Sequence, residues 1–459
     1  MRISVIGCGY LGAVHAACMA ELGHEVVGVD VDAAKIALLA AGRPPFFEPG
    51  LPELLTSAMA SGRLSFTTDP AAVADCTVHF IAVGTPQLGD SNAADLRFVD
   101  AALAGLLPHL SPGDLVVGKS TVPVGTAARL AVVVAESGSG ATLAWNPEFL
   151  REGFAVKDTI APDRLVYGVG EDAASAVSAL DAVYAAALAT GTPKVVTDYA
   201  TAELVKVAAN AFLATKISFI NAMAEVAEAT GADVTQLADA IGFDQRIGRR
   251  FLNAGLGFGG GCLPKDIRGF MARAEELGVE QALSFLREVD SINLRRRERM
   301  VDLAKEVVGG DLAGRRIAVL GLAFKPDSDD VRDSPALDVT VRLAQLGAIV
   351  TATDPEAVET ARARFPDVDY VGTAEEAAAG ADAVLLLTEW KQYRDLDPAA
   401  LAAVVAGSRM TATAPSTAPS ATAVSSPPAT RPAIVDGRNC LDPVAWRAAG
   451  WTYRALGRP

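Results

Sequence analysis

Two kinds of hydrophobic pattern alternate over the first two hundred residues. Short runs of consecutive apolar residues, such as RISVIG near the start and EVVGVD ending at Asp30, are separated by segments with helical spacing. Similar runs begin at residues 77 (TVHFIAVGTP), 114 (DLVVGKSTVPVG) and 141 (ATLAWNPEFL). Apolar strands that alternate with helices are typical of a parallel sheet covered on both faces. The pattern therefore predicts a doubly wound, Rossmann-like α/β domain over residues 1–198.

The pattern changes at residue 199. The segment YATAELVKVAANAFLATKISFINAMAEVAEAT contains no proline or glycine, and it predicts one helix of about nine turns. A helix of this length usually spans between domains or forms a subunit interface. We assign residues 199–305 to a central helical dimerisation domain, which also carries the loop before Cys262 and whose long helix joins two α/β domains.

A second alternation of strands and helices begins near residue 315. The runs RRIAVLGLAFKP, AIVTATDP and ADAVLLLTEW predict another Rossmann-like α/β domain over residues 306–459. Because GLAFKP replaces a glycine fingerprint, we expect this domain to hold a phosphorylated ligand through side chains such as Lys325. Residues 411–432 are almost entirely Ala, Thr, Ser and Pro, which predicts a disordered surface insertion.

Charge and cysteine content narrow the class of protein. A net charge of −15 argues against nucleic acid as a partner, because phosphate backbones require a basic surface. The five cysteines, at positions 8, 18, 76, 262 and 440, form no close pairs. Such a scattered, odd-numbered set suits a reducing compartment and favours neither a disulfide framework nor a zinc site. We expect a cytoplasmic protein with no structural metal and no membrane partner.

The segment GCGYLG, between the first strand and the first helix, carries a candidate cofactor site. Gly7, Gly9 and Gly12 form G-x-G-x-x-G, and Asp30 ends the following strand. In this context the glycines allow a tight turn, close approach of the backbone to a pyrophosphate, and packing of helix on strand. An acidic residue at Asp30 would accept the ribose hydroxyls and repel a 2′-phosphate. The constellation predicts binding of NAD rather than NADP.

The segment GFGGGCLPKD places a thiol beside an unusually glycine-rich stretch. Four of the five residues before Cys262 are glycines, which suggests a flexible loop that could bring backbone close to a ligand. Lys265 and Asp266 follow within a helical turn, and a nearby cation favours the thiolate form of cysteine. An NAD site together with a nucleophilic thiol suggests two successive hydride removals through a thiohemiacetal and a thioester. The other four cysteines are interpreted as packing residues.

Lys206 and Asn210 lie four residues apart on the predicted long helix and therefore share one face. A polar pair inside an otherwise apolar stripe suggests a site. The alternative is a lysine whose stem packs along apolar surface while its ammonium reaches solvent.

Several of these motifs also match a known family. GCGYLG, KSTVPVGT, NPEFLREG, KVAANAFLATKISFIN, GFGGGCLPKD, AFKPDSDDVRDSP and VDGRNCLDP resemble, in the same order and over nearly the whole chain, the UDP-glucose/GDP-mannose dehydrogenase family. The cysteine motif and DGRN look most like the branch that acts on UDP-glucose. The resemblance implies an NAD-dependent, four-electron oxidation of UDP-glucose to UDP-glucuronate by a homodimer with shared active sites.

The resemblance also implies roles for individual residues. Cys262 would be the nucleophile, Lys206 and Asn210 would stabilise the oxyanion, and Asp266 would position or activate water; which group is the base in each step stays open. The implied catalytic residues are Cys262, Lys206, Asn210, Asp266, Glu148 and Thr121. The implied NAD-binding residues are Gly7, Gly9, Tyr10, Leu11, Gly12, Asp30, Lys35, Thr85, Thr121, Glu152, Lys265 and Arg332. The implied substrate-binding residues are Glu148, Phe149, Leu150, Arg151, Glu152, Lys206, Asn210, Arg246, Phe251, Leu252, Asn253, Ala254, Gly255, Gly259, Lys325 and Arg438, with Arg246 reaching a neighbouring subunit's site.

Three other functions compete with this interpretation. The same chemistry could act on GDP-mannose or a UDP-N-acetyl-hexosamine. A two-electron hydroxyacid-type dehydrogenase with a structural Cys262 would leave the second nucleotide-type domain without a role. A catalytically silent nucleotide-binding or redox-sensing module would leave the set of Lys206, Asn210 and Asp266 unexplained.

Overall fold

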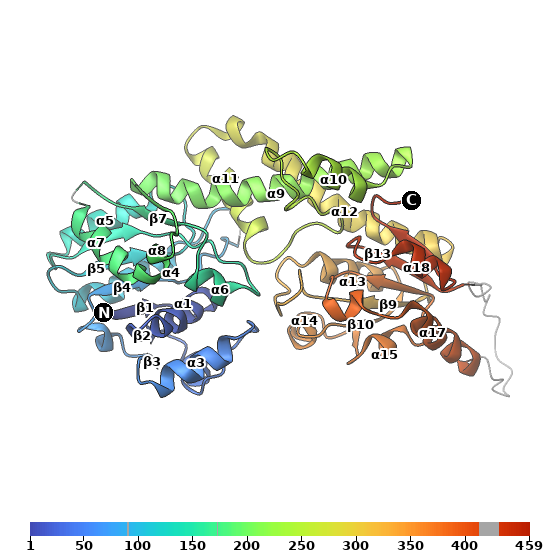
Figure 1. Ribbon diagram of the computed structural model, residues 1–459, viewed down its shortest axis with the longest axis horizontal. Helices are drawn as coiled ribbons and strands as arrows, with labels where there is room; N and C mark the ends of the chain where they lie inside the picture. The colour runs from blue at the N-terminus through green and yellow to red at the C-terminus, as the bar shows by residue number, and fades with distance from the viewer. Residues whose placement is uncertain (90, 172, 413–430) are drawn as a thin grey trace. The chain divides into compact units, whose positions relative to one another are not determined.

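The computed structural model describes residues 1–89, 91–171, 173–412 and 431–459 (Figure 1). The chain divides into two compact units, Met1–Ala211 with Lys265–Leu283, and Phe212–Pro264 with Ser284–Pro459. Most of the insertion predicted at residues 411–432 lies outside the described residues, and its first two residues end a helix. The division into domains at residues 198 and 305 stays a prediction.

The first unit is built on an eight-stranded sheet with the order β3-β2-β1-β4-β5-β6-β7-β8. All neighbouring strands are parallel except β6 and β7, which run antiparallel. The chain leaves β1 in one direction along the sheet and returns to its other side at β4, which makes the C-terminal end of β1 a topological switch point. The strands are β1 (Arg2–Ile6), β2 (Glu25–Val29), β3 (Leu64–Thr67), β4 (Val78–Ile81), β5 (Leu115–Gly118), β6 (Thr142–Trp145), β7 (Leu165–Gly168) and β8 (Lys194–Thr197).

Helices bury both faces of this sheet, as continuous apolar strands require. On β4 the adjacent residues Phe80 and Ile81 belong to two separate cores, because successive side chains point to opposite faces. One core packs against α1 (Tyr10–Glu21), α2 (Ala33–Ala40), α3 (Leu51–Ala60), α6 (Ala155–Ile160) and α7 (Ala174–Val183), and the short α8 (Ala185–Ala189) follows α7. The other packs against α4 (Arg97–Leu106) and α5 (Thr126–Glu136).

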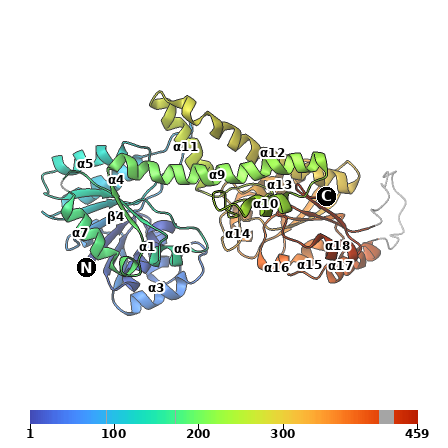
Figure 2. The same cartoon turned by 45° about the horizontal axis from the view of Figure 1, so that its top comes forward.

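The long helix α9 (Tyr199–Thr230) is continuous over the predicted range, which confirms that prediction (Figure 2). It is long and apolar enough to cross a membrane by length and composition, but 44% of its most apolar window is buried within the protein. It also carries Glu203 and Glu228, whose side chains accept hydrogen bonds from other elements. We therefore interpret α9 as a core helix, followed by α10 (Val234–Gly242), α11 (Leu263–Glu276) and α12 (Ser284–Val308).

The second unit contains a six-stranded, fully parallel sheet with the order β11-β10-β9-β12-β13-β14. Its strands are β9 (Arg316–Leu320), β10 (Ile349–Thr353), β11 (Asp369–Tyr370), β12 (Ala383–Leu386), β13 (Ala433–Asp436) and β14 (Thr452–Ala455). Its helices are α13 (Pro335–Gln345), α14 (Val358–Arg364), α15 (Ala374–Ala378), α16 (Lys391–Arg394), α17 (Pro398–Ala412) and α18 (Pro443–Ala448). The two sheets share the Rossmann-like crossover, and α9 runs from one unit into the other, so the predicted fold class is confirmed.

Candidate active site

The turn between β1 and α1 has the geometry of a dinucleotide-binding loop. Gly7 has φ +91°, and a Cβ there would lie 2.6 Å from the Val83 side chain. A Cβ on Gly12 would collide with the Gly7 carbonyl, whereas a Cβ on Gly9 would meet nothing within 4 Å. Two of the glycines are therefore required by the turn itself, and the third leaves open space beside the helix N-terminus. This space suits a pyrophosphate, because helix N-termini attract anions.

Asp30 lies at the end of β2, beside this loop. Its Oδ2 accepts hydrogen bonds from the Cys8 amide at 2.8 Å and from Lys35 Nζ at 2.9 Å, and its Oδ1 accepts one from the Asp32 amide at 3.0 Å. Burial alone would raise the pKa of Asp30, but these donors hold it below its usual value. The carboxylate is therefore charged at neutral pH and fits an adenosine ribose, with Lys35 at its side.

Replacing Asp30 by asparagine is expected to weaken NADH binding by about tenfold to a hundredfold, because a hydrogen bond to a charged group contributes roughly 1.5–3 kcal/mol. NADPH binding should weaken less, since the variant no longer repels the 2′-phosphate. Fluorescence titration with both dinucleotides measures the two affinities. Asp75→Asn, at an exposed ion pair with Arg2, is the matched control. An equal change for NADH and NADPH would contradict the assignment of Asp30 to the ribose.

The corresponding acid of the second sheet has a different environment. Asp354 follows β10, and its Oδ2 accepts hydrogen bonds from the Leu322 and Ala323 amides and from Trp390 Nε1. Its Oδ1 accepts two more, from the amides of residues 356 and 357. With five donors and 4% exposure, Asp354 has no capacity left for a ribose. This agrees with the absence of a glycine fingerprint in GLAFKP.

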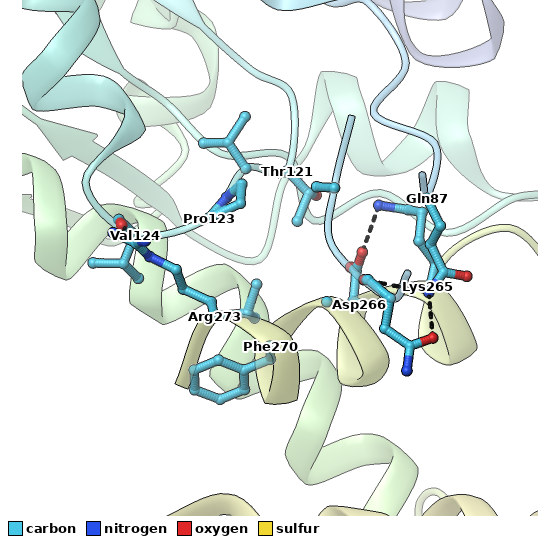
Figure 3. A pocket seen from close by; sticks show the side chains of 13 residues that line it. Gln87, Thr121, Pro123, Val124, Lys265, Asp266, Phe270 and Arg273 are labelled. Carbon is cyan, nitrogen blue, oxygen red and sulfur yellow. Dashed lines mark hydrogen bonds and ion pairs between the residues drawn. The ribbon is translucent and has the colours of Figure 1, made fainter. Parts of the chain in front are cut away.

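A pocket of the first unit brings together several predicted residues (Figure 3). Thr121, from the loop after β5, faces it together with Lys265 and Asp266 from the first turns of α11. Lys265 Nζ lies 2.8 Å from Asp266 Oδ1 and 3.4 Å from the Thr85 hydroxyl, which itself donates to the Thr121 carbonyl at 2.7 Å. Four of the predicted residues, Thr85, Thr121, Lys265 and Asp266, thus belong to one set of polar contacts.

Asn210 extends this set from α9, and Lys206 lies four residues before it on the same helix. Asn210 Nδ2 donates to Asp266 Oδ2 at 2.6 Å, and both side chains are buried. Lys206 Nζ lies 5.5 Å from the centre of the Phe149 ring, whose other cation neighbour is Arg164 at 3.8 Å. Asn210 is therefore held by a hydrogen bond, and the half-buried Lys206 places its ammonium over an aromatic ring.

Glu148 has a partner that sequence reasoning missed. Its Oε2 lies 3.0 Å from Lys119 Nζ, and its Oε1 accepts hydrogen bonds from the amides of Phe149 and Leu150. Burial alone would raise the pKa of Glu148, but the Lys119 ammonium holds it below its usual value. A single lysine at the end of the apolar strand LVVG was the available signal, because a buried ammonium requires a partner.

Glu48 is a second residue that was missed. It is 2% exposed, and its carboxylate accepts hydrogen bonds from the amides of Gly153 and Ala155, both at 2.7 Å, and from the Tyr10 hydroxyl. Glu48 therefore links the segment NPEFLREG to the dinucleotide-binding loop. The Tyr10 hydroxyl stabilises this link by its hydrogen bond to Glu48. Arg151 of the same segment forms an ion pair with Asp158 at 2.6 Å.

Cys262 stands apart from the other cysteines. It is exposed, whereas Cys8, Cys18 and Cys76 are buried and Cys440 is half-buried. Burial raises the pKa of the Cys76 thiol to about 11, and it raises those of Cys8, Cys18 and Cys440 further. Cys262 also directly precedes α11, and the N-terminal end of a helix stabilises an anion. It is the cysteine best suited to act as a nucleophile.

The glycines before Cys262 do not form a flexible loop, which corrects the expectation from sequence. Within the second unit, a Cβ on Gly255 would lie 2.6 Å from the Gly437 carbonyl oxygen, and one on Gly261 would lie 2.5 Å from Arg332 Cζ. Added Cβ atoms at Gly257, Gly259 and Gly260 would likewise overlap neighbouring atoms. Glycine occurs here because backbone packs directly against other segments.

Side chains from three elements hold this loop. Asn293 of α12 pairs with both the amide and the carbonyl of Phe258, at 2.8 and 2.9 Å. Asn221 of α9 accepts a hydrogen bond from the Gly255 amide, and Asn439 donates to the Ala254 carbonyl. Arg438, predicted to bind substrate, donates to the carbonyls of Gly257, Phe324 and Leu387. The guanidinium of Arg438 is thus engaged in fixing the loop.

The remaining predicted residues have varied surroundings in the second unit. The side chains of Leu252 and Ala254 are buried in a small core, so any contact with a substrate would come from their backbone. Phe251 has φ +65°, a conformation uncommon for a large residue. Arg246 is exposed and pairs with Asp244 at 2.6 Å, and Arg332 pairs with Asp330 at 2.7 Å. Among the described residues, no group of three or more His, Cys, Asp or Glu side chains could hold a metal ion.

Comparison with known proteins places these observations in a family. The sequence matches the NAD binding domain of the UDP-glucose/GDP-mannose dehydrogenase family over residues 1–188, its central domain over 200–295 and its UDP binding domain over 318–415. A UDP-glucose 6-dehydrogenase of Rhizobium meliloti (strain 1021) is 44% identical over 86% of this chain and 91% of its own length. A UDP-glucose 6-dehydrogenase of Bacillus subtilis (strain 168) is 39% identical over 100% of this chain and 93% of its own length.

Solved structures agree. A UDP-glucose dehydrogenase from Pyrobaculum islandicum is 40% identical, covers 100% of this chain and 98% of its own, and has a TM-score of 0.86. A UDP-D-ManNAc dehydrogenase from Pyrococcus horikoshii is 25% identical, with a TM-score of 0.81 over 100% and 99% of the two chains. The chain therefore belongs to the UDP-glucose/GDP-mannose dehydrogenase family, and its N-terminal α/β domain binds NAD.

Proposed function

We propose that this protein oxidises UDP-glucose to UDP-glucuronate with two NAD and one water, through a thiohemiacetal and a thioester on Cys262. The observation that carries the proposal is Cys262 itself, the exposed cysteine among five, directly before the helix that bears Lys265 and Asp266. The choice of UDP-glucose over other nucleotide sugars is supported by identities of 44% and 40% to proteins named for that substrate, against 25% to the UDP-D-ManNAc enzyme.

The chemistry follows from the roles of the side chains. When bound, NAD would supply the hydride acceptor for both oxidations at C6, and in each of them the proton of the C6 hydroxyl leaves to a base of the site. After the first, the thiolate of Cys262 adds to the aldehyde carbon, and after the second, C6 is held as a thioester. Water then attacks that carbon, the C–S bond breaks, and the thiolate is restored. Lys206 and Asn210 stabilise the negative charge that develops on the C6 oxygen.

Asp266 and Glu148 are the carboxylates of this mechanism. Asp266, held by Asn210 and Lys265, positions the attacking water, and Thr121 lies in the same pocket. Lys325 and the backbone of residues 251–255 would contact the nucleotide sugar. The NAD-binding residues would be those of the first unit around Gly7 and Asp30, together with Thr85, Glu152 and Lys265, and the family resemblance adds Arg332 of the second unit.

The stoichiometry of NADH to UDP-glucose tests the proposal. Two NADH per sugar, with UDP-glucuronate as the product, are expected from purified protein with excess NAD. One NADH per sugar, with an accumulating aldehyde or ketone, would mean that Cys262 is a packing residue and not the nucleophile. If UDP-glucose is inert while another nucleotide sugar yields two NADH, the thioester chemistry stands and the substrate assignment is wrong.

We further propose that the protein is a cytoplasmic homodimer that associates through α9. Phe212, Phe219 and Val226 are 67%, 48% and 54% exposed, and their spacing of seven residues places them on one face of the helix. In the dimer, Arg246 would reach the neighbouring subunit's site.

A charge in the middle of this apolar face should disrupt the dimer. Phe219→Asp is expected to shift the mass measured by light scattering from dimer toward monomer, because a buried, unpaired carboxylate opposes association. Val444→Asp, at a position of α18 that is 72% exposed, is the matched control. A Phe219→Asp protein that stays fully dimeric would place the interface elsewhere.

A further inference from the structure

Lys119 is a buried charge of the first unit with three polar partners. It directly follows β5, and its side chain is 4% exposed. Its ammonium lies 3.0 Å from Glu148 Oε2, 3.0 Å from Asn146 Oδ1 and 3.2 Å from the Tyr184 hydroxyl. Three N–H donors thus meet three oxygen acceptors, which fixes the ammonium in one place.

The neighbours of Lys119 are fixed in turn. The Tyr184 hydroxyl donates to Asn146 Oδ1 at 2.6 Å, and Asn146 Nδ2 donates to the Val166 carbonyl at 2.9 Å. The network therefore runs from the end of β5 to β7 and the end of α7. Glu148 is the member of this network that belongs to the proposed active site, and its other oxygen is held by the amides of Phe149 and Leu150.

We infer that Lys119 is a positioning residue for the reaction: it keeps the Glu148 carboxylate charged and in a single orientation beside the substrate. This inference rests on the proposed role of Glu148. Stability alone does not require an ion pair here, because buried pairs are often no more stabilising than apolar residues of similar size. The pair instead supplies a carboxylate whose direction does not change between the two oxidation steps.

Other titratable groups surround the pair. Glu148 and Lys119 line a cavity together with four other titratable residues, His15, Asp158, Asp163 and Arg164. Cys18 and Lys206 interact electrostatically with Glu148. Burial and the nearby Lys119 lower the pKa of His15, and neither of its ring nitrogens has a partner among the described residues. Neutral His15 cannot replace Lys119 as the counter-charge. Arg164 and Lys206 are further cations near Glu148, and both lie over the Phe149 ring.

Lys119→Met tests the inference, because it removes the charge and keeps an unbranched apolar side chain. Glu148 then becomes a buried carboxylate that has lost its main partner, so its pKa should rise. We expect kcat at neutral pH to fall by about tenfold to a hundredfold, as for other residues that orient a reacting group. The loss should diminish as pH rises, whereas the KM for NAD should change little. Lys194→Met, at the exposed ion pair with Asp181, is the matched control.

Thermal unfolding without substrate gives a second readout that does not depend on the proposed reaction. A carboxyl group whose pKa in the folded protein lies above its unfolded value stabilises the fold less as pH rises through the folded pKa. The melting temperature of Lys119→Met should therefore fall relative to wild type as pH increases. If this shift appears but Glu148→Gln has normal kcat, the pairing is correct and the proposed role of Glu148 is wrong.

Two results would overturn the inference. One is a folded Lys119→Met protein with the kcat and pH profile of wild type. The other is a loss of activity of equal size at every pH, which would indicate a purely structural role. If Lys119→Met does not fold, Tyr184→Phe removes one acceptor of the ammonium without removing its charge. The inference then requires a smaller loss of kcat with an upward shift of the acid limb of the pH profile, and an unchanged profile would reject it.

Discussion

Replacing Cys262 by serine is expected to abolish the release of UDP-glucuronate. A hydroxyl is a far weaker nucleophile than a thiolate at neutral pH, so neither the thiohemiacetal nor the acyl intermediate should form at a useful rate. The loss in kcat for two NADH per sugar should be on the order of 10³-fold or more, as for other enzymes that lose their nucleophile. NADH absorbance and analysis of quenched products by chromatography together measure the outcome.

The matched control is Cys440→Ser in the same unit. The Cys440 thiol is half-buried, lies 3.8 Å from Asp436 Oδ1 and has a raised pKa because of its burial. A serine hydroxyl can replace that weak hydrogen bond, so kcat should be nearly unchanged. If Cys262→Ser still converts UDP-glucose fully to the acid, Cys262 is not the nucleophile.

The features that follow from local patterns could be predicted from the sequence. Helix α9 has its predicted bounds because its apolar spacing is uninterrupted by glycine or proline. Gly7 and Asp30 have the predicted geometry because a strand, a turn and a helix impose it within thirty residues. Lys206 and Asn210 lie on one helix as predicted, and residues four apart on a helix share a face.

The features that depend on long-range contacts could not be predicted. Lys119 is 29 residues before Glu148 and 65 before Tyr184, and no periodicity relates them. Glu48 is more than one hundred residues away in sequence from the two amides whose hydrogen bonds it accepts. Each is a charged residue in an apolar setting, which indicates that a partner exists but does not identify it.

The glycine-rich loop shows how one composition can have two physical causes. Consecutive glycines suggest flexibility, because glycine has the largest backbone freedom in the unfolded chain. The same residue is also required wherever two backbones approach closely, and Gly255 against the Gly437 carbonyl is such a case. The loop before Cys262 is therefore closely packed, as the proposed nucleophile would require in order to stay in position through several steps.

The second large effect is expected at Asp266. Asp266→Asn keeps the size of the side chain and leaves an oxygen for the Asn210 amide, but it removes the charge that pairs with Lys265 at 2.8 Å. If Asp266 activates the water, hydrolysis of the thioester should slow by about 10²–10⁴-fold, the usual contribution of a general base. Both hydride transfers precede that step and should be affected much less.

The kinetics then take a distinctive form. Rapid mixing with UDP-glucose and NAD should give a burst of two NADH per active site, followed by slow turnover, because the acyl enzyme accumulates on Cys262. Intact mass spectrometry of the acid-quenched protein should detect the nucleotide sugar bound covalently. Asp181→Asn, at the exposed ion pair with Lys194, should show neither the burst nor the adduct. A slow reaction without a burst would instead mean that Asp266 acts before the thioester forms, because the step that it assists would then precede the second hydride transfer.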